Sequence, residues 1–208
     1  MPSLEAGVPA VLIDVRSNPG GDNSFSDHMV AWFADEPFRF ASNFLLRVSA
    51  QATASNARRL TPGDTGSISA QFAAFAEAKP GDVVDFDLGD TQPREGQRFE
   101  GKVYLLIDRH SYSNTVTVAA LAQDYGFARI LGEETSDRAS TYGAMEQFTL
   151  SRTGIIVNFP KAHIIRPGGN ANARGVVPDI AIRSPLVAAE DEMLKEALAS
   201  IRTDAAGD

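Results

Sequence analysis

Cysteine is absent from the 208-residue sequence, which excludes disulfides, iron–sulfur clusters and thiolate zinc sites within this chain. Histidine is scarce as well. The three histidines and the scattered carboxylates show no spacing typical of metal ligands. We therefore expect neither a metal nor a cofactor.

The chain also has fewer basic than acidic residues and no long apolar run. Lys and Arg number 19 against 27 Asp and Glu, which gives a formal net charge of −8, and the basic residues form no long run. Nucleic acids and anionic membranes are bound by basic faces, so this balance argues against both as main partners. No stretch approaches the roughly 20 apolar residues of a transmembrane helix.

What is present is a strand–helix–strand pattern in the second half of the chain. Residues 103–107 predict a buried strand, 112–125 a helix packed on more than one side, and 128–132 a second strand. The unit spans roughly 30 residues, the size of a right-handed crossover between parallel strands. Further strands are predicted at 10–15 and in a hairpin over 143–159.

These elements predict an α/β fold with a mixed sheet and flanking helices, in a single domain over residues 1–208. Residues 37–100 predict an irregular insertion within it. They hold a small, polar stretch at 51–56 and a short helix near 68–76. Their apolar side chains either line an apolar pocket or contact a missing N-terminal domain; the residues concerned are Phe38, Phe40, Phe44, Leu45 and Leu46.

Two amphipathic helices complete the pattern. One follows the glycine turn at residues 19–21, is capped by Asn23 or Ser24, and places His28 at the edge of the core. Its apolar face is expected to comprise Phe25, His28, Met29, Trp32 and Phe33. The other closes the chain, with an apolar face of Leu186, Met193, Leu194, Ala197, Leu198 and Ile201.

Ser113 stands where the buried strand turns into the helix, close to free N–H groups and the positive end of the helix dipole. A nucleophilic serine needs oxyanion donors, a proton acceptor and a groove for the substrate. Asn114 N–H and the N–H of Gly20 or Gly21 can serve as donors if the two strands are neighbours. The alternative role for Ser113 is that of a helix cap.

Four segments together resemble the tail-specific, or C-terminal-processing, serine protease family. They are Leu12–Gly21 (LIDVRSNPGG), Tyr104–Thr115 with its Ser-Tyr-Ser-Asn-Thr ending, the stretch Gln123–Thr135 that follows, and Gly175–Ile180 (GVVPDI), in the family's order. The resemblance implies a crotonase-like α/β core, Ser113 as nucleophile and an oxyanion hole from Gly20, Gly21 and Asn114. It also implies polypeptide substrates and a periplasmic, cell-envelope or secreted location. The sequence is compatible with an oligomer.

The sequence departs from the family at the position of the general base, the residue that accepts the proton of the nucleophile. The position of the family's lysine is occupied by Arg138, whose guanidinium, with a pKa above about 12, cannot accept a proton near neutral pH. The glutamate usually found three residues after the nucleophile is replaced by Val116. A related branch uses an upstream histidine and a downstream acid, whose position falls near Asn172, an amide able to orient an imidazole.

Two hypotheses for the base follow. In the first, which we favour, the chain is truncated at its N-terminus and an upstream domain supplies a histidine. In the second, the base is Lys161 or His163, which otherwise form a surface pair at a strand end. Tyr142 is expected to be a packing residue.

Two other functions compete with a protease. The chain also resembles interphotoreceptor retinoid-binding modules, which implies a non-catalytic relative that binds a hydrophobic ligand or a peptide. A crotonase-type acyl-thioester enzyme fits the turn at 16–19 and the motif at 175–180 less well. Asp14 and Arg16 are expected to be structural, because an unpaired carboxylate in a buried strand is costly.

Overall fold

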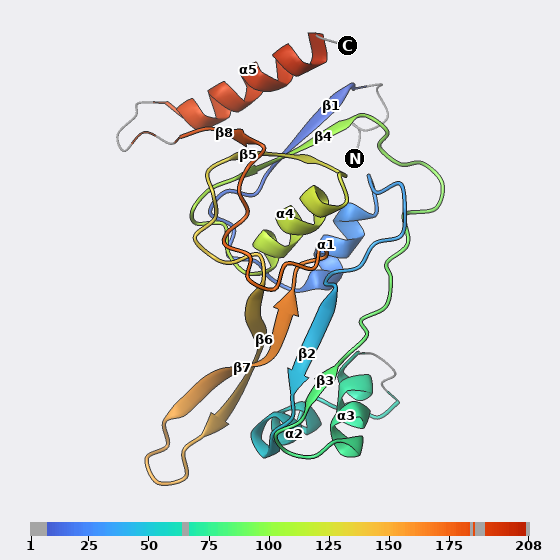
Figure 1. Ribbon diagram of the computed structural model, residues 1–208, viewed down its shortest axis with the longest axis vertical. Coiled ribbons are helices and arrows are strands. Elements are labelled where there is room, and N and C mark those ends of the chain that lie inside the picture. The colour runs from blue at the N-terminus through green and yellow to red at the C-terminus, as the bar shows by residue number, and fades with distance from the viewer. Residues whose placement is uncertain (1–7, 64–66, 184, 186–189, 207–208) are drawn as a thin grey trace.

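A four-stranded parallel sheet forms one end of the computed structural model, which describes residues 8–63, 67–183, 185 and 190–206 (Figure 1). Neighbouring strands are parallel throughout, in the order β1-β4-β5-β8. The strands are β1 (Ala10–Asp14), β4 (Lys102–Ile107), β5 (Arg129–Gly132) and β8 (Ile180–Ala181).

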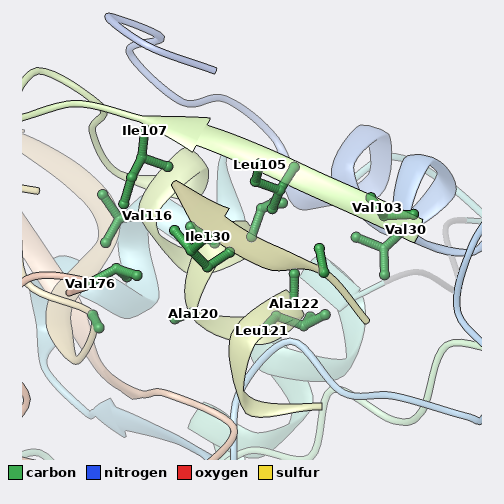
Figure 2. Close-up of a cluster of buried hydrophobic side chains, with 14 of the residues drawn as sticks. Val30, Val103, Leu105, Ile107, Val116, Ala120, Leu121, Ala122, Ile130 and Val176 are labelled. Carbon is green, nitrogen blue, oxygen red and sulfur yellow. The ribbon is translucent and has the colours of Figure 1, made fainter. Parts of the chain in front are cut away.

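Helices cover both faces of this sheet, which is why its central strands β4 and β5 are buried at every residue after the first, Lys102 and Arg129. Helix α4 (Asn114–Asp124) and α1 (Asn23–Val30) lie on one face, and α5 (Glu192–Ala206) lies on the other (Figure 1). Figure 2 shows alternate side chains of β4 packed against α4. The remaining side chains of β4 pack against Met193 and Ala197 of α5. The predicted strand–helix–strand unit is therefore confirmed.

A four-stranded antiparallel sheet, in the order β3-β2-β7-β6, forms the other end of the molecule. The predicted hairpin supplies two of its strands, and the segment 37–100 supplies the other two together with two helices. These elements are β6 (Thr141–Thr149), β7 (Ile156–Ile165), β2 (Asn43–Arg47), β3 (Val83–Asp85), α2 (Ala50–Ala57) and α3 (Ser67–Glu77).

The segment 37–100 is thus more regular than its sequence suggests. It builds a second core jointly with the hairpin, since Phe44, Leu46 and Phe75 pack with Ala162 and Ile164 of β7. Helix α2, which the small and polar residues at 51–56 did not predict, begins at the cap Ser49, whose hydroxyl accepts the Ala52 N–H at 3.0 Å. Because residues of β7 complete this core, the segment 37–100 needs few large apolar side chains of its own.

The predicted face of α1 is right only in part. Met29 packs against the core as predicted, but the helix turns Ser26 and Val30 fully inward, whereas Phe25 is 80% exposed and His28 is also exposed. Its cap is Asp22, whose side chain accepts the Ser24 N–H. The helix ends at Val30, so Trp32 and Phe33 belong to the following turn and lie outside the helical pattern.

Helix α5 agrees with the predicted closing helix in that Met193 and Ala197 are buried, but Leu198 of the predicted face is exposed. Leu186 lies outside the described residues. No helix in the described part of the chain is long and apolar enough to cross a bilayer.

Candidate active site

Ser113 occupies the cap position of α4 with backbone angles φ 55° and ψ −124°. Positive φ is unusual for a residue with a side chain and is found where function requires a strained turn, as in the nucleophile elbow of hydrolases. The Ser113 side chain is exposed, and its hydroxyl makes no capping hydrogen bond. The turn therefore presents the hydroxyl to solvent at the start of a helix.

The turn after β1 lies directly against the turn that carries Ser113. Tyr112 N–H donates to the carbonyl of Asn18 at 3.0 Å, and the Thr115 hydroxyl donates to Asn18 Oδ1 at 2.9 Å. A Cβ atom added to Gly20 would lie 2.7 Å from both Asn114 N and Tyr112 O. Pairing of β1 with β4 brings these two turns together from positions about 90 residues apart.

Two backbone donors remain available beside Ser113. Gly20 N–H donates to Asn18 Oδ1 at 2.9 Å, so it is already engaged. Among the residues that the structure describes, Gly21 N–H and Asn114 N–H have no acceptor, and Asn114 is the first residue of its helix. Gly21 N–H and Asn114 N–H are therefore the backbone donors available near Ser113, and Gly20 provides the close approach between the turns.

Replacing Gly20 with alanine is expected to lower the free energy of unfolding by about 2 kcal/mol or more. The new Cβ clashes with backbone atoms at a φ of +87°. Urea unfolding measures the effect. Gly154→Ala is the matched control, because Gly154 has a φ of +71° and open space around it. Equal costs for both variants would contradict the proposed close approach.

Ser113 lies in a groove of about 350 Å³ whose walls come from both ends of the molecule. Phe40 and Phe44 of the segment 37–100 and residues 141–145 of β6 line it. Phe38 and Leu46, in contrast, are fully buried. Two of the five apolar side chains expected to line a pocket therefore line this groove. Tyr142, expected to be a packing residue, is 69% exposed at its edge.

Asp137 is the groove residue that sequence reasoning missed. Its Oδ2 accepts the Ser113 N–H at 2.8 Å, and its Oδ1 accepts the Arg138 N–H at 2.9 Å. The carboxylate therefore holds the backbone of Ser113 in its strained conformation. The only feature of the sequence that points to Asp137 is its position next to Arg138, which replaces the lysine of the family. Arg138 itself is exposed and does not line the groove.

The other sequence-predicted candidates lie away from the groove. Lys161 is 3% exposed and bonded to Glu146 at 2.6 Å in a neighbouring cavity, so it is not the surface residue that the alternative assumed. His163 stacks on Tyr142 with ring centroids 4.6 Å apart. Asn172 is exposed in the loop after β7, where its N–H donates to Asn170 Oδ1 at 3.2 Å. None of these three lines the groove.

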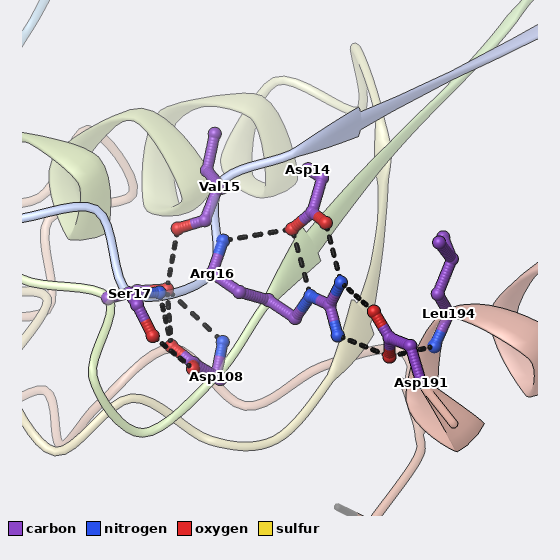
Figure 3. Close-up of polar contacts among 8 residues, drawn as sticks. Asp14, Val15, Arg16, Ser17, Asp108, Asp191 and Leu194 are labelled. Carbon is purple, nitrogen blue, oxygen red and sulfur yellow. Dashed lines mark hydrogen bonds and ion pairs between the residues drawn. The ribbon is translucent and has the colours of Figure 1, made fainter. Parts of the chain in front are cut away.

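Asp108 ties together the loops that support Ser113 (Figure 3). Its carboxylate accepts the Ser17 N–H at 2.9 Å, the Ser17 hydroxyl at 3.1 Å and the His110 N–H at 3.0 Å. Burial alone would raise the pKa of Asp108, but these hydrogen bonds and one from Ser111 outweigh it and hold the pKa below its usual value.

An ion-pair network at the end of β1 is structural, as expected. Arg16 pairs with Asp14 at 2.6 Å and with Asp191 at 2.7 Å, which joins β1 to the start of α5 (Figure 3). The hydrogen bond from Arg16 lowers the pKa of Asp191 to about 2.

Asp108→Asn is expected to reduce the free energy of unfolding by about 2 kcal/mol at pH 7, because charge-assisted hydrogen bonds are lost. The pKa of Asp108 is lower in the folded protein than the unfolded value of about 3.9, so the carboxylate stabilises the fold above that pH. The difference between variant and wild type should shrink as the pH falls below about 4. Urea titrations across pH test this, with exposed Asp35→Asn as the control. A pH-independent difference would refute it.

No group of three or more His, Asp or Glu able to hold a metal occurs in the part of the chain that the structure describes.

Comparisons with known proteins agree on one family. The profile of peptidase family S41 matches residues 2–182. A search of curated proteins finds no significant match. Among solved structures, mature CPAF complexed with lactacystin has 17% identity and a TM-score of 0.64, with 93% of this chain and 43% of that chain covered.

Two further structures give a similar result. The photosystem II D1 C-terminal processing protease has 18% identity and a TM-score of 0.55, with 93% of this chain and 40% of that chain covered. A putative peptidase from Parabacteroides merdae has 18% identity and a TM-score of 0.60, with 92% and 51% covered. At these identities the likeness concerns the fold, and the chain spans about half or less of each protein's length. The profile match over most of the chain shows that it belongs to peptidase family S41.

Proposed function

We propose that this chain carries the catalytic serine of a peptidase-like hydrolase that cleaves polypeptides. Ser113 is the nucleophile, and the N–H groups of Gly21 and Asn114 bind the oxyanion. The observation that carries the proposal is the exposed Ser113 hydroxyl on a left-handed turn, beside two available backbone donors and above a groove. This is the arrangement that acyl transfer requires.

In the proposed reaction, Ser113 Oγ bonds to the carbonyl carbon of the scissile peptide, and the carbonyl electron pair moves onto its oxygen. The two N–H groups and the positive end of the α4 dipole stabilise that charge. Collapse of the intermediate breaks the C–N bond and leaves an acyl-enzyme with Ser113, while the amine departs with the proton that the Ser113 hydroxyl has lost. Water then attacks the ester, the bond between its carbonyl carbon and Ser113 Oγ breaks, and a proton from the water returns to Oγ as the carboxylic acid product leaves.

The proton acceptor is the remaining part of the proposal. Asp22 and Asp137 line the groove, but Asp22 caps α1 and Asp137 holds the Ser113 backbone. The Tyr112 and Tyr142 hydroxyls are the other titratable groups on its described wall. We therefore retain the hypothesis that a histidine from a preceding segment of the natural protein completes the site, and that Asp137 acts as a positioning residue.

A fluorophosphonate probe tests the proposal on the full-length natural protein. We expect one equivalent of adduct, mapped by mass spectrometry to the peptide that contains Ser113. An adduct on another serine, or no adduct while the protein remains folded, would overturn the assignment.

One observation favours a second function, that of a non-catalytic relative. Phe40 and Phe44 give the groove an apolar wall suited to a hydrophobic ligand or peptide. Tight binding of an apolar fluorophore without any fluorophosphonate adduct would support this function over hydrolysis.

A further inference from the structure

A second cavity, of about 320 Å³, lies beside the groove of Ser113 and shares five lining residues with it. The cavity and the groove are therefore adjacent. The shared residues are Asn23, Phe40, Phe44, Ala144 and Met145.

A buried ion pair forms one wall of this cavity. Glu146 and Lys161 are 4% and 3% exposed, and Lys161 Nζ lies 2.6 Å from Glu146 Oε1. Ser55 Oγ donates to Glu146 Oε2 at 2.5 Å, and Arg59 also bonds the carboxylate. Both oxygens of Glu146 are therefore occupied, and these donors hold its pKa below the usual value against the effect of burial.

Two polar groups in the wall of the cavity have unused hydrogen-bonding capacity. The Lys161 ammonium has three N–H donors, of which two reach Glu146 and Asn56, and its Nζ lies 5.9 Å from the centre of the Phe75 ring. Its third N–H has no nitrogen or oxygen acceptor among the described residues. Gln71, 6% exposed, has an Oε1 atom with no hydrogen-bond partner. A buried polar atom without a partner costs about 1–3 kcal/mol, so Gln71 Oε1 favours a ligand that supplies a donor, and Lys161 can donate to the same ligand.

The charges around the cavity balance. Asp27 and Glu146 contribute two negative charges, and Arg59 and Lys161 contribute two positive ones. A charged ligand would disturb this balance in a desolvated site, so a neutral group is favoured.

We propose that the cavity is a substrate subsite for a primary carboxamide, the side chain of glutamine or asparagine. The inference rests on the proposed function, since it places a substrate in the groove of Ser113. The amide oxygen accepts from Lys161, and the amide NH₂ donates to Gln71 Oε1.

Charged, aliphatic and hydroxyl side chains meet only part of this demand. A carboxylate offers no donor to Gln71, and an ammonium group offers no acceptor to Lys161. An aliphatic side chain serves neither group. A hydroxyl has a single oxygen for both roles, whereas a carboxamide presents its acceptor and donor on separate atoms.

The test compares peptides that are identical except for a Gln or a Met at each position in turn. We expect kcat/KM to favour Gln about tenfold at one position, the effect of a pair of buried hydrogen bonds. In Gln71→Met this preference should fall below about threefold, through slower cleavage of the Gln peptide alone. The exposed residue Gln51→Met on α2 is the matched control and should retain the preference.

Binding of the same peptides to Ser113→Ala separates the subsite from the catalytic proposal. If the Gln peptide binds about tenfold more tightly and Gln71→Met removes the difference, the subsite stands even where no hydrolysis is found. If peptides are cleaved or bound without discrimination between Gln and Met, or if Gln71→Met leaves the discrimination intact, the inference is overturned and the cavity holds water only. Thermal unfolding verifies that Gln71→Met is folded.

Discussion

Replacing Ser113 with alanine is expected to lower kcat/KM for peptide hydrolysis by about 10³-fold or more. The variant keeps the groove, Gly21 N–H and Asn114 N–H, so binding and oxyanion stabilisation persist while the covalent step is lost. Initial rates with a fluorogenic peptide and the full-length natural protein measure the effect.

The stability of this variant provides the first control. The Ser113 hydroxyl makes no capping hydrogen bond, so the free energy of unfolding should change by less than about 0.5 kcal/mol. Ser151→Ala, in the exposed turn of the β6–β7 hairpin, is the matched control for activity and should retain it. Hydrolysis by Ser113→Ala within tenfold of the wild type would exclude this serine as the nucleophile.

Replacing Lys161 with methionine is expected to cost about 3 kcal/mol in the free energy of unfolding at pH 7. The change leaves the Glu146 carboxylate buried with Arg59 and Ser55 as its remaining partners, and breaking a buried ion pair on one side is strongly destabilising. Loss of the ammonium group removes an interaction that lowers the pKa of Glu146, so this pKa is higher in the folded variant than in the folded wild type. The variant should therefore regain stability relative to the wild type as the pH falls towards about 5.

The double variant Lys161→Met with Glu146→Leu separates charge from packing. It removes the uncompensated carboxylate and should recover at least about half of the lost stability. Lys79→Met, at an exposed position after α3, should change stability by less than about 0.5 kcal/mol. A double variant as unstable as the single one would show that the stem of Lys161, and not its charge, stabilises this region.

The parallel sheet was predictable because its signals are local. Residues 103–107 and 128–132 form short, mostly apolar runs, which are typical of strands covered on both faces of a sheet. The helix between them is apolar on several faces, so it packs on more than one side. The same local pattern places Ser113 at the strand-to-helix junction. The nearby glycine turn could be paired with it once β1 and β4 were taken as neighbours.

The antiparallel end was harder to predict because its elements depend on distant partners. Helix α2 consists of small and polar residues and is stabilised by packing on β6. The phase of α1 is set by contact of Ser26 and Val30 with the rest of the core, which leaves Phe25 exposed despite its apolarity. Intrinsic helix propensity and periodicity do not contain this information.

The finer details of the site also depend on side chains whose contacts the sequence does not reveal. Gly20 N–H is occupied because it donates to the side chain of Asn18, and this leaves Gly21 N–H available. Asp137 reaches the Ser113 N–H from 24 residues downstream, which no local pattern indicates.

The groove described above has Ser113 beside one sheet and much of its wall on another. The turn with Ser113 belongs to the parallel sheet, whereas Phe40, Phe44 and residues 141–145 belong to the antiparallel end. Under the proposed function, mutations in the second region would alter which polypeptides bind while the surroundings of Ser113 stay unchanged. Selectivity could then diverge, or be engineered, by changes confined to the hairpin and the segment 37–100.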